Sequence, residues 1–200
     1  MGRYNMATKE STLKNMLVTL FLVTFIASSV LAFMHKLTEE PIRLSKMRKK
    51  EQALKAVMPD FTNSPVEEMK TVKPEGSKYK LEVYPAKAEG EMKGFAVRSY
   101  TSKGYSGEFW IMVGFTPEGK INGITVLQQK ETPGLGTKMT EKPFKSQFEG
   151  LDPSNADIRV SKDGGQIDAI TAATISSRAY CGATRRAYKA FKAYKKQSEE

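Results

Sequence analysis

The segment from Asp168 to Ser177, with the sequence DAITAATISS, combines residue types that would suit a bound phosphate group. It contains the hydroxyls of Thr171, Thr174, Ser176 and Ser177, the small side chains of Ala172 and Ala173, and a leading acid, Asp168. A strand-like run ends near Ile170 and a long helical pattern begins near Thr174, so backbone N–H groups without helical partners should gather there. A phosphate would therefore suit this helix start, where Asp168 could orient or polarise the Thr174 hydroxyl or hold a metal ion during a phosphoryl transfer.

The same residues also admit a purely structural interpretation. Either Thr174 or Thr171 could be the N-cap of the helix, where a hydroxyl is worth about 1 kcal/mol, and the alanines would then only form a turn. A second segment, Lys130 to Gly136 (KETPGLG), follows a strand-like run, and its Pro-Gly pair is by itself typical of a tight turn. Neither segment alone decides between a site and a turn.

The string from Asp168 to Thr174 resembles the flavinylation motif of the FMN-binding domain family, Asp-x-x-(Ser/Thr)-Gly-Ala-(Thr/Ser). The resemblance implies that Thr174 accepts FMN through a phosphoester bond, with Asp168 as the leading acid and Thr171 as the internal hydroxyl. Ala172 stands where glycine is usual, and an alanine would be strained if that position needs a positive φ. The rival Gly-Ala-Thr string that ends at Thr184 lacks the acid and lies in the middle of the expected helix, so we expect it not to accept the flavin.

The loop from Glu131 to Gly136 resembles the Glu-Thr-Pro-Gly-Leu-Gly loop of the ion-pumping respiratory subunits in this family. These are the G subunit of the Rnf electron-transport complex and the C subunit of the sodium-pumping NADH:quinone oxidoreductase. Residues 104–107 (GYSG) and 162–165 (KDGG) also resemble the family, so the likeness extends over roughly residues 93–185. The short chain with one N-terminal anchor favours the Rnf type.

The resemblance implies a defined set of cofactor contacts. They are Thr174 with the covalent FMN, Ser176 and Ser177 at its phosphate, Thr132, Leu135 and Gly136 against the isoalloxazine ring, Glu131 near the ring or the ribityl chain, Tyr105 as another wall, and Lys162 near the ring or phosphate, besides Asp168 and Thr171 of the motif. For Leu135 and Tyr105, ordinary packing is an equally open interpretation.

The implied function is that of an electron-carrier subunit of a membrane ion-translocating ferredoxin:NAD oxidoreductase of the Rnf type. Its implied partners are the other subunits of that complex and a flavin transferase that uses FAD and a divalent metal. Three alternatives stay open: the FMN-carrying subunit of a sodium-pumping NADH:quinone oxidoreductase, a cofactor-free anchored assembly subunit, and a binder of non-covalent FMN. The sequence shows no general base, nucleophilic triad or metabolite pocket, so we expect no catalytic residues in this chain.

The first positioning element is an apolar stretch. Residues 15–34 carry no charge and would form about 30 Å of helix, the thickness of the hydrocarbon core of a bilayer. A cleaved signal peptide would have a shorter apolar core. We therefore expect an N-terminal tail (1–14) and a transmembrane helix (15–34). Charges on both sides leave the orientation open, and the family implies a single-pass protein of the inner (plasma) membrane with its C-terminal domain on the periplasmic or exterior side.

The remaining elements follow from periodicity and turn residues. Residues 35–78 read as a charged helix and linker, in which Pro41 should bend or break the chain before a helix over 42–58. The FMN-binding domain then covers residues 79–200. Strands are expected at 79–84, 94–100, 107–116, 121–129, 157–160 and 166–170, a short helix at 142–148 and a long one at 174–196. This order predicts an α+β fold with an antiparallel sheet and flanking helices.

Composition excludes several other functions. The net charge is +10, but the basic runs at 46–50 and 189–196 have helical spacing and no interleaved aromatics, which disfavours nucleic-acid binding and favours a solvated or lipid-facing helix surface. The single cysteine, Cys181, cannot form an internal disulfide or a thiolate cluster. The single histidine, His35, lies just after the apolar stretch, so we expect no metal site.

Overall fold

The computed structural model describes residues 12–199, so the predicted N-terminal tail lies outside the described residues except for residues 12–14. The first element is one long helix, α1 (Leu13–Val57), and Pro41 lies inside it. Of the predicted bend or break at this proline, the break is therefore wrong, and no separate helix starts at residue 42. The reason is local: proline removes the hydrogen bond to the carbonyl of Leu37, and at an exposed position water or a polar headgroup can satisfy that carbonyl. Residues up to Arg48 and residues from Lys49 onward form separate compact units.

The N-terminal half of α1 is apolar on all sides. Its most hydrophobic window has a mean hydropathy of 2.4, and none of that window is buried within the protein. Large side chains from Leu13 to Leu37 are exposed, which would be costly in water and is expected in a bilayer. Thr24 and Ser29 donate their hydroxyls to main-chain carbonyls one turn earlier, so they remain compatible with lipid. The chain is therefore membrane-associated through this helix.

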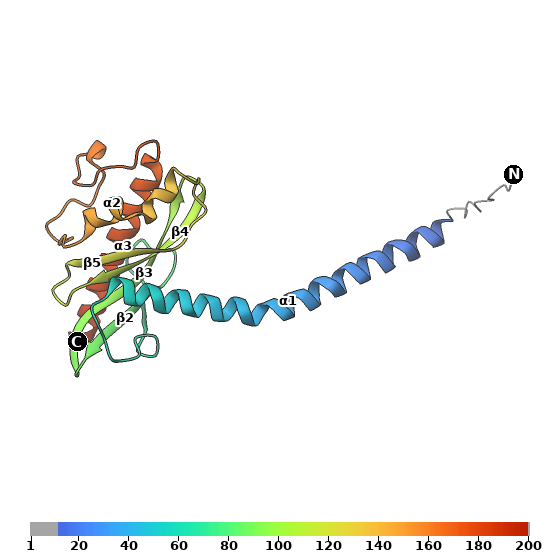
Figure 1. Ribbon diagram of the computed structural model, residues 1–200, viewed down its shortest axis with the longest axis horizontal. Coiled ribbons are helices and arrows are strands. Elements are labelled where there is room, and N and C mark those ends of the chain that lie inside the picture. Colours follow the sequence, from blue (N-terminus) through green and yellow to red (C-terminus); the bar gives the residue numbers. More distant parts are fainter. Residues whose placement is uncertain (1–11, 200) are drawn as a thin grey trace. The chain divides into compact units, whose positions relative to one another are not determined.

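The second unit is built on a five-stranded antiparallel sheet whose strands follow each other in chain order (Figure 1). The strands are β1 (Lys70–Val72), β2 (Leu81–Ala88), β3 (Glu91–Gly104), β4 (Gly107–Phe115) and β5 (Ile121–Gln128). The four strands expected between residues 79 and 129 are confirmed. The short edge strand β1 lies in the segment predicted as a charged helix and linker. Of its three residues only Val72 is buried, which is too little pattern to predict a strand.

Short helices and turns connect the sheet to the C-terminal helix. They are η1 (Gly136–Thr140), α2 (Lys142–Lys145), η2 (Ser146–Phe148) and η3 (Ser161–Asp163), followed by the long helix α3 (Thr174–Glu199). The strands expected at 157–160 and 166–170 are wrong: the two segments form only a single parallel bridge between Val160 and Ile167. Parallel strands need a long crossover connection, and the short turn between these segments cannot supply one.

The two faces of the sheet bury different layers because successive side chains of a strand point to opposite faces. On β3, Phe95 and Val97 pack in the core beneath α3, whereas Ala96 faces the last turns of α1. Figure 1 shows α3 running along the sheet. The layer on the α1 side consists of Ala53, Leu54, Val57, Met58, Tyr84, Ala86, Ala96 and Met112. Helices on both faces of an antiparallel sheet confirm the predicted α+β fold.

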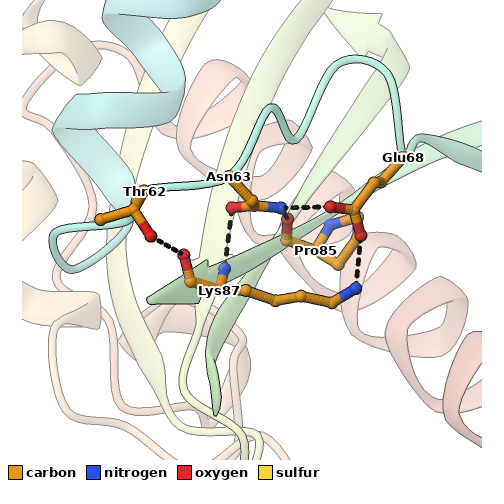
Figure 2. A network of polar contacts seen from close by, with 5 residues as sticks. All are labelled: Thr62, Asn63, Glu68, Pro85 and Lys87. Atoms are coloured by element: carbon orange, nitrogen blue, oxygen red, sulfur yellow. Dashed lines mark hydrogen bonds and ion pairs between the residues drawn. The ribbon is translucent and has the colours of Figure 1, made fainter. Parts of the chain in front are cut away.

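A polar network ties the loop after α1 to strand β2 (Figure 2). The Asn63 amide donates to the Pro85 carbonyl at 3.0 Å, and the Lys87 backbone N–H donates to Asn63 Oδ1 at 2.9 Å. Glu68 accepts from both Asn63 Nδ2 at 2.9 Å and Lys87 Nζ at 2.5 Å. Pro85 has no N–H to donate to a neighbouring strand. Its carbonyl is therefore bonded by the Asn63 side chain of the loop instead of by another strand.

Candidate functional site

A cavity of about 480 Å³ opens where the β3–β4 turn, the loop after β5 and the start of α3 meet. Its lining residues are Tyr105, Glu131, Thr132, Leu135, Gly136, Ala172, Ala173, Thr174, Ile175 and Ser176. These come from three segments that are distant in the sequence. The structure thus brings together the predicted flavin acceptor, the predicted ring contacts and one of the predicted phosphate contacts. The volume of the cavity lies in the usual range of small-molecule sites.

The start of α3 presents free backbone donors to this cavity. The Ser177 N–H donates to the Ala173 carbonyl at 3.0 Å, which makes Ala173 the N-cap and Thr174 the first helical residue. Neither threonine is therefore the N-cap, and the structural interpretation of Thr174 is wrong. Within residues 12–199, the N–H groups of Thr174, Ile175 and Ser176 make no hydrogen bond, and the first turn holds no acidic residue. This end of the helix would stabilise an anion.

The turn before the helix requires an unusual backbone conformation. The Ala173 N–H donates to the Ile170 carbonyl at 2.9 Å, and Ala172, the third residue of this turn, has a φ of 60°. A positive φ at the third position is the mark of a type II turn and favours glycine. Because Ala172 has a positive φ, the expected strain at this position, where the family motif has glycine, is confirmed. A non-glycine residue in this conformation costs about 1–2 kcal/mol.

We expect Ala172→Gly to stabilise the protein, because glycine relieves this strain. After the extra entropy that glycine gives the unfolded chain, the net gain should be about 0.5–1 kcal/mol. Urea unfolding of the flavin-free full chain in detergent measures it. Ala169→Gly is the matched control, since Ala169 has an ordinary φ and should lose about 0.5–1 kcal/mol. Equal destabilisation by both changes would show that Ala172 is not strained.

Glu131 is the buried acid of the cavity, with 5% of its surface exposed. Its Oε2 accepts from Ser176 Oγ at 2.8 Å, and its Oε1 accepts from the Ser106 N–H at 3.2 Å. Its own N–H donates to Gln129 Oε1 at 2.5 Å. A buried carboxylate needs such donors to offset its lost hydration. Glu131 therefore joins the β3–β4 turn to the start of α3 and fixes two walls of the cavity.

Two glycines make room for this carboxylate. A Cβ on Gly136 would lie 2.6 Å from Glu131 Oε2 and 2.9 Å from Ser176 Oγ, and a Cβ on Gly104 would lie 2.6 Å from Glu131 Oε1. All three distances are shorter than real Cβ contacts, so larger residues would push the acid out of place. Glycine at positions 104 and 136 is therefore required sterically, because a side chain there would collide with Glu131.

The Pro-Gly turn of the loop forms as the sequence predicts. The Leu135 N–H donates to the Thr132 carbonyl at 3.2 Å, and Gly134 has a φ of 75°. The turn leaves Leu135 40% exposed, and the β3–β4 turn leaves Tyr105 69% exposed. Side chains this exposed at a cavity mouth are not core packing residues of this chain. Their position favours contact with a ligand.

The other predicted contacts do not line the cavity. Lys162 is exposed on η3, and Thr171 is exposed at the second position of the type II turn. Asp168 is also exposed, and its backbone is held by the side-chain amide of Gln147. Ser177 is buried and structural: its hydroxyl accepts from the Ile170 N–H and donates to the Ala173 carbonyl, each at 3.0 Å. Roles for these four toward a cofactor remain predictions.

The rival threonine is inaccessible. Thr184 is fully buried in the middle of α3, and its hydroxyl donates to the Tyr180 carbonyl at 3.0 Å. In contrast, Thr174 is half-buried, and its hydroxyl makes no hydrogen bond within residues 12–199. Ile175, which is 50% exposed, also lines the cavity and was not predicted as a site residue. An apolar side chain directly after the acceptor was the available signal.

The arrangement fits a ligand with an anionic end and a flat apolar body. Free amides and the Thr174 hydroxyl lie at one end, and the two alanines before the helix leave that end open. Leu135 and Tyr105 supply apolar surface, with Glu131 as the fixed polar group. FMN has this shape and charge distribution, so the residues present suit it.

Comparison with known proteins agrees with this geometry. The FMN-binding domain family matches residues 104–189. Over 94% of its length the chain is 30% identical to the G subunit of the ion-translocating oxidoreductase complex of Pseudomonas aeruginosa, 92% of which is covered. It is 32% identical to the G subunit of the Na⁺-translocating ferredoxin:NAD⁺ oxidoreductase complex of Acetobacterium woodii, over 80% of this chain and 82% of the relative.

A solved structure shares the fold. The crystal structure of the C subunit of the Na⁺-translocating NADH-quinone reductase from Parabacteroides distasonis superposes with a TM-score of 0.50. The sequences are 19% identical, and the match covers 74% of this chain and 90% of that one. At this identity the likeness establishes the architecture of the sheet and its flanking helices, and no more.

Proposed function

Because the chain belongs to the family of G subunits of ion-translocating oxidoreductase complexes, we propose that it carries electrons in such a complex through an FMN bound covalently to Thr174. The chain is then one redox subunit of a larger assembly of the ferredoxin:NAD type, with the other subunits as its partners. It has no substrate chemistry of its own in this proposal.

The observation that carries the proposal is the uncapped start of α3. Among residues 12–199, three consecutive N–H groups, from Thr174 to Ser176, are left without partners by an N-cap residue, Ala173, that has no polar side chain. An N-cap hydroxyl or carboxylate is worth about 1 kcal/mol, so its omission costs stability. A phosphate on Thr174 Oγ1 would lie beside these donors and would restore what the cap lacks.

The covalent bond requires a phosphoryl transfer from FAD, supplied by a flavin transferase. The Thr174 hydroxyl attacks the phosphorus on the FMN side of the pyrophosphate, the new Oγ1–P bond forms, and AMP leaves with the electrons of the broken P–O bond. The hydroxyl proton passes to a base of the transferase or to water. Thr174 is suited to this attack because it is half-buried at the cavity and its hydroxyl is not engaged elsewhere among the described residues.

When bound, FMN takes up and releases electrons at its isoalloxazine ring, which a phosphoester leaves unmodified. In this proposal Leu135 and Tyr105 contact the ring and limit access of water, and Thr132 and Gly136 shape the adjoining wall. Glu131 holds these walls together through Ser106 and Ser176, and so fixes the position of the ring relative to the phosphate.

The proposal is tested on the chain produced together with its transferase. On a denaturing gel the band should fluoresce under ultraviolet light, and the intact mass should exceed that of the polypeptide by one FMN less one water. Fluorescence that runs off the gel would indicate a non-covalent flavin, and a colourless chain from its assembled native complex would indicate a cofactor-free assembly subunit. Both results would contradict the proposal.

We further propose that the domain faces the periplasm or cell exterior, as a single-pass protein of the inner membrane. A large C-terminal domain can cross with little influence from nearby charges, and a covalent bond would keep the flavin from being lost on that side. Protease added to spheroplasts should then remove the domain, whereas inverted vesicles should protect it. The reverse pattern would place the domain in the cytoplasm.

A further inference from the structure

A second and larger cleft, of about 690 Å³, lies against another side of α3. Its walls come from the end of β3, the loop at residues 75–76, the η3 region and α3 itself. Six of the lining residues are cationic and two are acidic: Lys103, Arg159, Arg178, Arg185, Arg186 and Lys189 against Glu75 and Asp163. We call this the basic cleft.

Several of these cations are not used inside the protein. Arg178 is paired with Asp163 at 2.7 Å, and Arg159 is paired with Asp157. In the part of the chain covered by residues 12–199, Lys103, Arg185 and Lys189 form no ion pair, and all three are exposed. Arg185 and Lys189 lie one turn apart on α3. Their mutual repulsion costs stability and would be relieved by negative charge from another molecule.

The floor of the cleft contains a glycine that the fold does not require. Gly182 lies in the middle of α3, has an ordinary φ, and a Cβ built on it meets nothing within 4 Å. Glycine in a helix interior is less favourable than alanine by about 1 kcal/mol, so the fold alone would favour a larger residue here. Because no other segment within residues 12–199 comes within 4 Å of that Cβ, the notch at Gly182 is suited to a partner that approaches the helix closely.

Cys181 also lines the cleft, but its thiol does not give the cleft a chemical function. Burial raises the pKa of its thiol to about 12, so it carries almost no thiolate at neutral pH and is a poor nucleophile. The cleft is therefore a charged surface and not a thiol site.

The basic cleft adjoins the flavin cavity, and Ile175 lines both. This residue directly follows Thr174 and is a half-exposed apolar side chain between the two hollows. An exposed apolar side chain beside several arginines is a common combination at protein interfaces, where arginine is enriched. The cations from Arg178 to Lys189 extend over about 16 Å of helix, which is wider than a single phosphate, and a concave surface fits a protruding loop better than a flat lipid layer.

We propose that the basic cleft is the docking surface for an acidic face of the protein that exchanges electrons with the flavin. This inference rests on the proposed function, because it is the flavin on Thr174 that makes the adjoining cleft the point of closest approach. Complementary charge speeds such encounters and orients them, which an electron carrier needs more than tight binding.

Carbodiimide cross-linking of the purified membrane complex tests the docking directly, since it joins lysine amines to contacting carboxylates as amides. The carbodiimide takes up the water lost in this condensation and leaves as a urea. We expect mass spectrometry to find Lys103 and Lys189 joined to aspartates or glutamates of another chain. Cross-links of these lysines only to acids of their own chain would overturn the proposal. The Thr174→Ala complex should give the same cross-links, so this result is independent of whether Thr174 carries flavin.

Charge reversal tests the role in electron transfer. In the complex, Arg185→Glu combined with Lys189→Glu should slow flavin reduction by NADH or reduced ferredoxin at least about tenfold at low salt, with reduction by dithionite unchanged. Lys192→Glu with Lys196→Glu is the matched control: both residues are exposed on α3 outside the cleft, and the change in charge is equal. Equal slowing by the two pairs, or slowing by neither, would overturn the proposal.

The notch at Gly182 gives a separate test, in which a small side chain should raise stability and a large one should slow electron transfer. Gly182→Ala should raise the midpoint of thermal unfolding of the full chain by about 2–4 °C, because alanine favours the helix and meets no clash. The larger Gly182→Leu should leave folding intact but slow flavin reduction within the complex by at least about tenfold. Normal reduction in the leucine variant would show that no partner approaches the notch.

Discussion

Thr174→Ala is expected to abolish covalent flavin completely, with no fluorescent band on a denaturing gel and no gain in mass. The reason is chemical: the Oγ1 that forms the phosphoester is absent, and the hydroxyls of the two serines in the first turn of α3 are already engaged. Ser176 Oγ is held by Glu131 at 2.8 Å, and the Ser177 hydroxyl is bonded at the turn before the helix. Electron transfer through the complex should be lost with the flavin.

Two controls separate loss of the bond from loss of the fold. Thr174 is the first residue of α3, where alanine is a good helix former, so stability should change by no more than about 0.5 kcal/mol. Thr174→Ser keeps the hydroxyl and should retain flavin, whereas Thr184→Ala removes a buried hydroxyl far from the cavity and should also retain it. Fluorescence that survives in Thr174→Ala but disappears in Thr184→Ala would identify Thr184 as the acceptor.

Gly114→Ala is expected to be the most destabilising small substitution in the sheet, at about 3 kcal/mol. Strand β4 passes directly beneath the end of α1 at this point. A Cβ on Gly114 would lie 2.6 Å from the Val57 carbonyl carbon and would overlap the carbonyl oxygen. The last turn of α1 would have to move away from the sheet, which would also break the bond from Asn122 Nδ2 to the Val57 carbonyl, now 2.9 Å long.

Gly123 provides the matched control, because it pairs directly with Gly114 across β4 and β5. A Cβ there would lie 3.6 Å from the nearest atom, the Ala56 carbonyl oxygen, which is an ordinary contact. Gly123→Ala should therefore change the free energy of unfolding by no more than about 0.5 kcal/mol. Urea unfolding of both variants of the full chain in detergent decides the matter: equal effects would mean that packing of α1 on Gly114 does not limit stability.

Much of the architecture could be predicted because its causes are local. The uncharged stretch of residues 15–34 is long enough for a membrane helix whatever follows it, and alternation in the middle of the chain defines four strands. The errors also have physical causes. Pro41 stays within α1 because its helix is exposed, and the segments around Val160 and Ile167 cannot become strands because a tight turn joins them.

The candidate site likewise has features that the sequence predicts and features that it does not. Its motifs could be read from the sequence because each is a turn with a local requirement: a positive φ at Ala172 and at Gly134. The partners of Glu131 could not be read, because Ser106 and Ser176 lie 25 and 45 residues away and meet it only through packing. The exclusion of Lys162, Asp168, Thr171 and Ser177 from the cavity wall likewise depended on where the turns direct their side chains.

By itself the sequence determined which residue types are available: a hydroxyl at the start of a helix, a Pro-Gly loop, an apolar anchor and a surplus of positive charge. These features depend on the conformation of a few neighbouring residues, so they can be predicted without knowing the tertiary structure. Only the tertiary structure decided that Thr174 and not Thr184 opens into a cavity, and that the cations gather in a cleft beside it. Those outcomes depend on contacts between distant segments, and such contacts form only when the sheet and α3 pack together.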